Sequence, residues 1–527
     1  QKVFENKNVG DYFQAKQGMT TADNNRFLRY WFEVDNNKIG LKIANKEEAQ
    51  KSKRKWFPYN KGGEFRKWYG NNDYVVNWYN DGEELKKYTS TLPQGTAVRL
   101  KSQEYYFKES ATWSFIGSKF GVRYSPKGAI FDVGGSSIFP EDNIEYLISF
   151  LNTNISNDLL KLINPTMNYQ IKDVRLLPFI KNDIFKDKIK KIFDECIRIS
   201  KEDWDSFETS LDFKTHPMIK YKKNNDFKFG NYTLKDSFEN WKKNCDENFK
   251  ALKENEEELN KIFINIYDLQ NEITYKVDSK DVTIRKADVL REVKSFINYA
   301  VGCMFGRYSL DEEGLIYAGS EFDNSKYIKF KVDSDNIIPI TDEQYFNDDI
   351  VQRLIQFLEI SFGKTTLIEN IDFIAETLGK KGTETSEEAI RRYFIDDFFN
   401  DHVKMYQKRP IYWLLDSGKK NGFKALIYMH RYNENLIPKA RLDYLHRVQN
   451  TYEKLLSDIN YKLTTDLSMS DKKDAQKRQA DLNAKLQEIK EYDEKISHVA
   501  NQRISIDLDD GVKVNYEKFK DILAKIK

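Results

Sequence analysis

The chain has 527 residues, 40% of them hydrophobic and 14% aromatic, and its formal net charge is +2. This composition excludes a mainly disordered chain and predicts a folded protein of roughly two to four domains. Because no apolar run approaches about 18 residues, we expect no membrane span.

The few cysteines and histidines exclude several kinds of site. Cys196, Cys245 and Cys303 are far apart, which suits a reducing cytoplasm and excludes both a disulfide framework and a zinc ribbon. The five histidines never fall at ligand spacing, so we expect no metal site. The sequence starts at Gln1 with no initiator Met and no leader, which favours the interior of a longer polypeptide.

Charge is unevenly distributed along the chain. Residues 1–180 carry 26 Lys or Arg against 20 Asp or Glu, whereas residues 300–400 carry 10 basic against 20 acidic side chains. A basic front and an acidic middle indicate an anionic partner for the first part only.

Residues 1–180 switch often between short β-like runs and turns. Alternating apolar residues predict a strand from Phe27 to Val34, and Gly134-Gly135 indicates a hairpin turn. Between them, residues 38–70 form a basic segment with ten Lys or Arg, three Glu and six aromatic residues around residues 56–69.

Lysine and arginine side chains bind DNA phosphates, and aromatic rings can stack on bases or line a groove. A solvated, partly mobile loop is the alternative interpretation of the basic segment. For contacts with DNA phosphates we select Lys53, Arg54, Lys55, Lys61, Arg66 and Lys67.

The stretch from Asn152 to Phe179 predicts a short apolar helix that ends at Asn164, because Pro165 disfavours the helical conformation of the residue before it. A polar run follows, and then a predicted strand through Val174 and Leu177. Asparagine and glutamine can pair in bidentate fashion with adenine, so these side chains could read bases. The alternative is an ordinary helix–loop–strand unit whose polar residues cap the turn. For base or groove contacts we select Asn25, Arg26, Arg123, Thr166, Asn168 and Gln170.

From Lys181 the apolar period becomes helical. It predicts one helix over Ile184–Ile199 and a long second helix that follows a capping-box pattern at Asp236 and Glu239. Farther on, Asn421-Gly422 predicts a β-hairpin, and the period over residues 441–503 predicts an antiparallel helical hairpin.

These patterns predict an α+β protein with four segments. They are a mixed, β-rich first domain (1–180), a long helical spacer (181–284), a mixed α/β domain (285–440), and a helical hairpin with the C-terminal tail (441–527).

Common catalytic arrangements are absent from the sequence. It has no GxSxG, GxxxxGK[ST] or HExxH motif, no Cys/His cluster and no credible nuclease signature. The Asp-Pro-Pro-Tyr type of motif, with which amino-methyltransferases hold a flipped base, and a glycine-rich loop for S-adenosylmethionine are also missing. We therefore assign no catalytic residue and expect no cofactor in this chain.

Six blocks spread over the whole chain carry a family resemblance: GMTTADNNRFLRYW, GVRYSPKGAIFDVGGSSIF, LLKLINPTMNYQIKDVRLLPF, AVGCMFGRYSLDEEGLIYAG, KRPIYWLLDSGKKNGFKALIYMHRY and IDLDDGVKVNYEKFKDILAKIK. In this order they resemble the carboxy-terminal half of PglX, the adenine-specific DNA methyltransferase family of BREX phage-defence systems. A smaller pattern recurs in target-recognition domains of related restriction–modification enzymes: Asn164, Pro165, Thr166, Asn168, Gln170, Asp173 and Pro178.

The resemblance implies a division of labour. In such enzymes an amino-terminal Rossmann-like domain binds S-adenosylmethionine and methylates a flipped adenine, and a carboxy-terminal domain reads the DNA sequence. The resemblance therefore implies that the first domain (1–180) is a DNA target-recognition domain. The catalytic half has no counterpart here, so methylation is expected of the parent enzyme.

Three hypotheses follow for the function of the chain. The first is DNA target recognition, with double-stranded DNA as the partner. The second is a scaffold that docks other BREX proteins, with phage inhibitors as further partners. The third, a cryptic nuclease, has the least support in the sequence.

Overall fold

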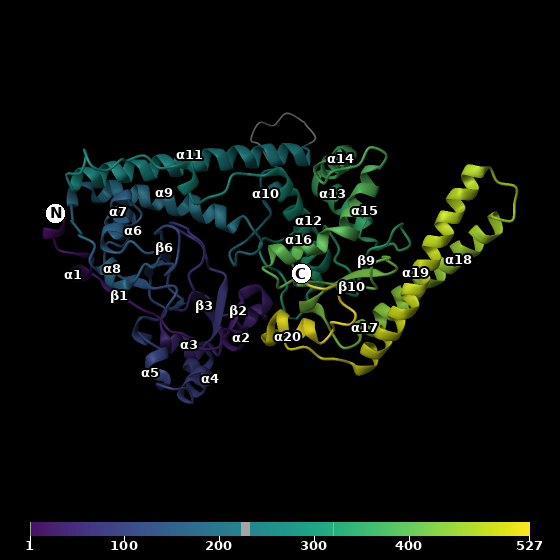
Figure 1. Cartoon of the computed structure of the whole chain (residues 1–527), viewed down its shortest axis with the longest axis horizontal. Helices are drawn as coiled ribbons and strands as arrows, with labels where there is room; N and C mark the ends of the chain where they lie inside the picture. The colour runs from purple at the N-terminus through teal and green to yellow at the C-terminus, as the bar shows by residue number, and fades with distance from the viewer. Residues whose placement is uncertain (1, 223–231, 320) are drawn as a thin grey trace. The chain divides into compact units, whose positions relative to one another are not determined.

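The computed structural model describes residues 2–222, 232–319 and 321–527, which fold into two compact units (Figure 1). Unit 1 comprises the residues up to Trp31, Asn36–Phe213 and Lys242–Ala287; unit 2 comprises Phe32–Asp35, Lys214–Trp241 and Asp288–Lys527. The predicted segments 1–180 and 181–284 therefore fall largely within unit 1.

Two four-stranded sheets lie in unit 1. The first is antiparallel, in the order β1 (Gln14–Lys16), β8 (Ser137–Phe139), β5 (Ser110–Trp113) and β6 (Val122–Ser125). The second has the order β2 (Leu28–Tyr30), β4 (Tyr74–Asn77), β3 (Trp56–Asn60) and β7 (Ile130–Phe131), and only its β3–β7 pair is parallel.

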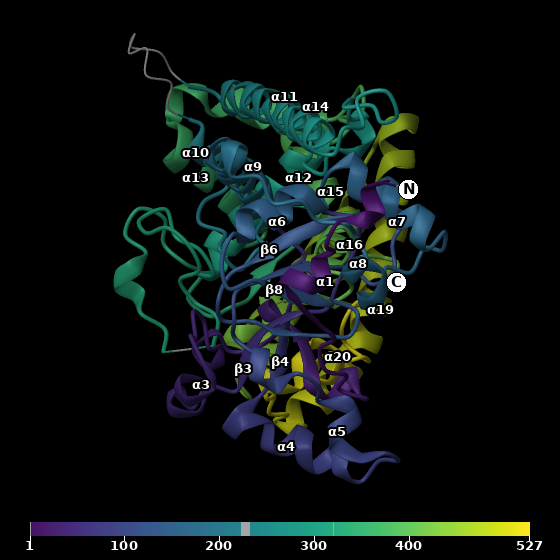
Figure 2. The same ribbon diagram turned by 90° about the vertical axis from the view of Figure 1, so that its left-hand side faces the viewer.

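Helices surround these sheets (Figure 2). The shorter ones are α1 (Val9–Tyr12), α2 (Asn24–Phe27), α3 (Lys46–Ser52), α4 (Tyr79–Ser90), α5 (Gly95–Arg99), α6 (Ile144–Leu151), α7 (Asn154–Ile163) and α8 (Ile171–Arg175). The longer ones are α9 (Lys186–Asp205) and α11 (Leu234–Ile266), whose residues from Lys242 onward belong to unit 1.

Helix α11 is part of the core of unit 1. Its Leu252, Leu259 and Phe263 are buried in one apolar cluster with residues of β5, β6, α6 and α9. An ion pair of 2.5 Å between Lys188 and Glu258 also joins α9 to α11.

Unit 2 is mainly helical. Its helices are α10 (Pro217–Lys220), α12 (Val289–Phe305), α13 (Ile350–Phe362), α14 (Leu367–Thr377), α15 (Ser386–Asp396), α16 (Phe398–Met405), α17 (Leu436–Lys439), α18 (His446–Lys462), α19 (Met469–Gln502) and α20 (Gly511–Glu517). A π-helical turn, Ala440–Leu445, leads into α18. A small antiparallel sheet contains β10 (Tyr412–Asp416), β11 (Lys424–Tyr428) and β9 (Ile338–Pro339), in that order.

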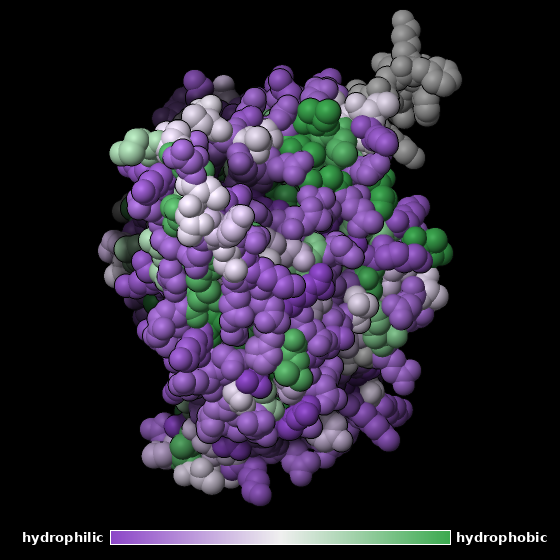
Figure 3. Space-filling model, turned by 90° about the vertical axis from the view of Figure 1, so that its right-hand side faces the viewer, coloured by the Kyte–Doolittle hydropathy of each residue, from purple (hydrophilic) through white to green (hydrophobic). Residues whose placement is uncertain are grey.

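Several predicted elements are confirmed. The fold is α+β, α7 stops before Pro165 with Asn164 as its extended C-cap, and β10 and β11 form the predicted hairpin with Asn421 at a positive φ of 54°. Helices α18 and α19 form the predicted helical hairpin, and Ser468 caps the start of α19. Figure 3 shows the side of the molecule that carries this hairpin, and most of the surface on that side is hydrophilic.

Other predicted elements are wrong. The strand expected through Val174 and Leu177 is helix α8 and a turn, because these two residues are buried at i, i+3 spacing while Leu176 is exposed. The strand expected from Phe27 to Val34 ends at Tyr30, where a 3₁₀ turn, Trp31–Glu33, follows.

The hairpin expected at Gly134-Gly135 is also wrong, because β7 and β8 belong to different sheets. Neither glycine has the positive φ that tight hairpin turns need. Their lack of a side chain instead allows close approach to another backbone, since a Cβ on Gly135 would lie 2.1 Å from the carbonyl oxygen of Asn60.

The capping box of α11 lies three residues earlier than predicted. Thr233 and Asp236 form it, with reciprocal hydrogen bonds of 3.1 Å and 3.0 Å between the side chain of each residue and the backbone N–H of the other. Among the described residues, no helix combines the length and the hydrophobicity of a membrane span.

Buried histidines make the stability of unit 2 depend on pH. Burial lowers the pKa of His216 from 6.5 to about 3, and burial, together with Arg307, lowers the pKa of His430 to about 3. The unfolded chain therefore takes up protons near pH 6.5 while the folded chain stays neutral at both rings. Stability is complete above that pH and is lost progressively as the pH falls towards 3.

We expect each of these histidines to cost about 2 kcal/mol of unfolding free energy at pH 5 relative to pH 7. Hydrogen exchange of α12 and β11 at the two pH values measures this loss. The His216→Gln variant should show a smaller difference between the two pH values, whereas replacing the exposed His498 by Gln should leave it unchanged. An equal pH effect in both variants would contradict the assignment.

Candidate nucleic-acid interface

Two loops of unit 1 lie side by side, Ser114–Lys119 after β5 and Asn164–Gln170 between α7 and α8; we call them the paired loops. The Tyr169 N–H donates to the Phe115 carbonyl at 2.8 Å, and the Gly117 N–H donates to the Met167 carbonyl at 3.2 Å. Ile116 and Asn168 lie opposite each other in an antiparallel bridge. Backbone pairing therefore fixes the loop that the sequence predicts to read bases.

Some polar side chains of this loop are used to shape it. The Asn164 amide donates to the Asp173 carboxylate at 2.6 Å and to the Asn168 carbonyl at 3.1 Å. The Thr166 hydroxyl donates to the Asn164 side-chain oxygen at 2.7 Å. For Asn164 and Thr166, the interpretation that polar residues cap a turn is therefore correct.

The paired loops rest on buried aromatic residues. The Trp113 indole N–H donates to the Tyr169 carbonyl at 2.9 Å, and the Tyr169 ring centroid lies 5.2 Å from that of Phe120. Trp113 and Phe120 are buried in the core. This support restricts the motion of the loop that carries Asn168.

Asn168 and Gln170 present amide groups that the fold does not use. Both residues are half-buried, and no hydrogen bond joins either side-chain amide to another of the described residues. Thr166 beside them is exposed. These groups can act as hydrogen-bond donors and acceptors towards a ligand.

The front half of the basic segment is accessible. Lys53 and Arg54 follow α3 and are exposed, and Lys53 ends that helix in the left-handed conformation with φ of 53°. Lys55 and Lys61 are half-buried, with their ammonium groups 5.3 Å from the Trp56 ring and 5.5 Å from the Tyr74 ring. Partial burial lowers the pKa of Lys61, and the Asp132 carboxylate acts against this shift.

Lys61 lies at the same edge of unit 1 as the paired loops. A Cβ on Gly62 would be 3.5 Å from the Cα of Ser114, and a Cβ on Gly134 would be 2.8 Å from the Lys61 carbonyl oxygen. Ser114 is the first residue of the paired loops. The structure therefore places the backbone that follows Lys61 beside the first of the paired loops.

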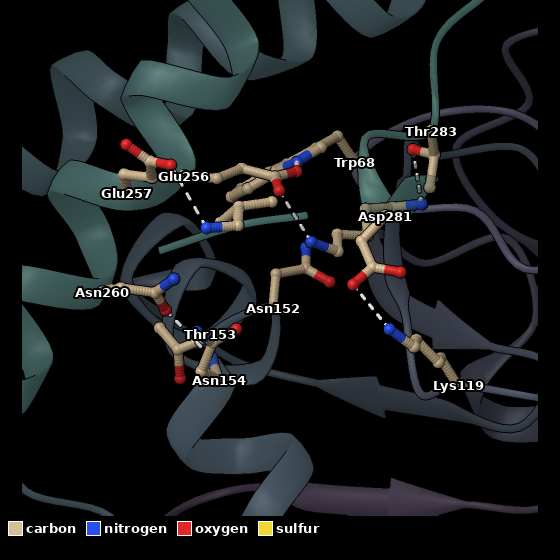
Figure 4. Close-up of polar contacts among 12 residues, drawn as sticks. Trp68, Lys119, Asn152, Thr153, Asn154, Glu256, Glu257, Asn260, Asp281 and Thr283 are labelled. Atoms are coloured by element: carbon tan, nitrogen blue, oxygen red, sulfur yellow. Dashed lines mark hydrogen bonds and ion pairs between the residues drawn. The ribbon is translucent and has the colours of Figure 1, made fainter. Parts of the chain in front are cut away.

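The back half of the basic segment is buried. The Lys67 ammonium is 2.7 Å from the Glu256 carboxylate, and the Trp68 indole N–H donates to the same carboxylate at 2.8 Å (Figure 4). The Arg66 guanidinium is 2.6 Å from the Asp203 carboxylate. Because Arg66 and Lys67 are paired in the interior, they do not fit the predicted role in phosphate binding, and we leave them out of the interface.

Arg123 is also buried, with 2% of its surface exposed. Burial, and to a smaller extent Arg66, lowers the pKa of its guanidinium to about 10, and Asp73 acts in the opposite direction. Burial likewise raises the pKa of Asp73 to about 6. Arg123 lies beneath the paired loops, 3.4 Å from the Ser114 hydroxyl, and does not fit the predicted base contact.

The remaining predicted residues, Asn25 and Arg26, lie on α2. Both are exposed, and Arg26 forms an ion pair of 2.9 Å with Glu84 and lies over the Tyr88 ring. Among the described residues, no hydrogen bond or ion pair joins α2 to the paired loops. The structure therefore does not bring these two residues together with Asn168.

Comparison with known proteins relates the whole chain to two curated relatives. It is 44% identical over 515 residues to the adenine-specific methyltransferase PglX of Lacticaseibacillus casei (strain Zhang). It is 38% identical over 537 residues to the adenine-specific methyltransferase BrxX of Escherichia coli O9:H4 (strain HS). The chain resembles part of a PglX-type methyltransferase.

These alignments include 96% and 95% of this chain but only 42% of each relative. The chain thus spans less than half the length of the curated relatives that it matches. No protein-family model matches the chain.

The Glu256 contacts predict a large local contribution to stability. Glu256→Ala leaves the buried Lys67 ammonium without its carboxylate, so we expect a loss of about 3–5 kcal/mol in the free energy of unfolding. Glu258→Ala on the same helix removes a half-exposed ion pair and should cost less than about 1 kcal/mol. Urea unfolding followed by circular dichroism measures both losses, and equal losses would contradict this role for Glu256.

Proposed function

We propose that this chain is the DNA target-recognition part of an adenine-specific DNA methyltransferase of the PglX type, which acts in BREX phage defence. The observation that carries this proposal is the backbone pairing of the two loops, which holds an Asn168 amide that has no hydrogen-bond partner among the described residues. The two relatives, both named as adenine-specific methyltransferases, support it, because such an enzyme must find its adenines in double-stranded DNA.

The geometry suits a division between positioning and reading. Lys53, Arg54, Lys55 and Lys61 would contact phosphates and set the register of the duplex, a contribution that does not depend on base sequence. Asn168 and Gln170 would face base edges, where asparagine and glutamine pair best with adenine, and the exposed Thr166 would lie beside them. Asn25 and Arg26 would reach the groove or backbone at a separate point.

Methyl transfer and S-adenosylmethionine binding would belong to the part of the relatives that has no counterpart in this chain. There the target adenine would be flipped out of the duplex for modification. In this proposal the present chain chooses where on the DNA that reaction occurs.

The proposal predicts binding that depends on salt and on sequence. We expect affinity for duplex DNA to fall steeply between 50 and 200 mM salt, on the order of a hundredfold for the four phosphate contacts proposed here. A double Lys53→Gln/Arg54→Gln variant should lower the slope of log affinity against log salt by about 1.8, because about 0.9 is lost per phosphate contact. Fluorescence anisotropy with a labelled duplex measures this slope.

A matched control uses two lysines of the turn between β10 and β11. The Lys419→Gln/Lys420→Gln variant removes the same charge from unit 2 and should leave the slope unchanged. Selection from a random duplex library should also return a preferred sequence. The absence of both salt-dependent binding and a preferred sequence would overturn the proposed function.

A scaffold role for unit 2 is the second candidate. The tip of the α18–α19 hairpin exposes Tyr461 and Met469, at 73% and 86% of their surface, on an otherwise hydrophilic element. Exposed apolar side chains of this kind can anchor a protein partner. A Tyr461→Ser/Met469→Ser variant should then recover fewer BREX proteins in pull-downs while DNA binding persists; unchanged recovery would contradict this candidate.

A further inference from the structure

The paired loops place an exposed aliphatic side chain directly beside the Asn168 amide. Ile116 has 65% of its surface exposed, and it is the residue opposite Asn168 in the antiparallel bridge. Ile116 could not be predicted from the sequence, since an isolated apolar residue in a loop carries no periodic signal. Only the pairing of two segments 52 residues apart in the chain brings it beside Asn168.

The hydrogen bonds define how these two side chains are related. The flanking bonds run from Gly117 N–H to Met167 and from Tyr169 N–H to Phe115. Ile116 and Asn168 are therefore a non-hydrogen-bonded pair, the arrangement in which opposite side chains are closest and point to the same side. Their Cβ atoms are expected about 4.5–5.5 Å apart.

We infer that Ile116 and Asn168 together read one A·T base pair in the major groove. The Asn168 amide pairs with the adenine N6 and N7 edge, and the Ile116 side chain covers the C5-methyl group of the thymine. An A·T pair presents both features on one edge, whereas a G·C pair lacks the methyl group and offers a different pattern of donors and acceptors. This inference rests on the proposed function and adds the identity of the base pair that these two residues select.

Three features of the site fit this assignment. Ile116 is largely exposed and is not among the residues that form or pack against the apolar core of unit 1, so core packing does not account for an isoleucine here. The backbone that carries both residues is supported by the Trp113 indole N–H at the Tyr169 carbonyl, which limits rearrangement on binding. The Asn168 amide has no hydrogen-bond partner among the described residues, so it is available to a base edge.

The test uses the preferred duplex that selection returns with the full chain. In that duplex each thymine is replaced in turn by deoxyuridine, which removes only the methyl group, and each adenine by 7-deazaadenine, which removes only N7. We expect one A·T pair at which both replacements weaken binding. Loss of the methyl contact should reduce affinity about fourfold, the equivalent of one buried methyl group.

Variants then assign each effect to its residue. Ile116→Ala should abolish the response to deoxyuridine at that pair, and Asn168→Ala should abolish the response to 7-deazaadenine at the same pair. Ile116→Val should retain the methyl response. Ile184→Ala, which removes an even more exposed isoleucine side chain elsewhere in unit 1, should change neither response.

The outcomes separate this inference from the proposed function. If no duplex is preferred and binding does not depend on salt, the proposed function fails and this inference fails with it. Selective binding that persists while no deoxyuridine replacement weakens it overturns only the assignment of the A·T pair. The same holds if the Ile116→Ala variant still loses affinity when that thymine is replaced. Responses that map to two different base pairs would also overturn it.

Discussion

The buried carboxylate of Glu256 holds together the parts of unit 1 that position the paired loops. It accepts hydrogen bonds from the Lys67 ammonium and the Trp68 indole, and so fastens α11 to the end of the basic segment. The Trp68 backbone in turn pairs with β6 through Val122 and Tyr124, at 2.8 Å and 2.7 Å. Strand β6 pairs with β5, from which the first of the paired loops continues. A charge that is buried without its partner is costly, so this chain of contacts requires α11 to remain docked.

Buried ion pairs, including the one with Glu256, explain why the basic segment of the sequence does not form a uniformly basic surface. Lys53 and Arg54 are exposed, whereas Arg66 and Lys67 meet Asp203 and Glu256, which lie more than 130 residues farther along the chain. A sequence pattern shows which residues can bind phosphate, but it does not show which acidic residues the fold places beside them. In the proposed function, the exposed Lys53 and Arg54 would therefore contact DNA, whereas Arg66 and Lys67 would not.

Effects between neighbouring residues could be predicted from the sequence, whereas pairing between distant segments could not. Pro165 ended α7 at Asn164, and Asn421-Gly422 made the β10–β11 hairpin, because both effects act between neighbouring residues. The two glycines at 134 and 135 were misread because the backbone that they approach belongs to Asn60 and Lys61, far away in sequence. For the candidate site, Asn168 and Gln170 were predicted from residue type, whereas Ile116 could be found only from the pairing of its loop.

The sequence also did not predict which early residues belong to unit 2. Phe32–Asp35 lies within the predicted target-recognition domain but folds with unit 2. There Glu33 is 3% exposed and accepts a 2.9 Å hydrogen bond from the Val512 N–H, close to the end of the chain. The side chain of Phe32 packs edge-on against Tyr406. Cutting the chain near residue 285 would therefore leave a buried acid and an aromatic ring of the first part without their partners, so the roles of the two units are better separated by point variants than by truncation.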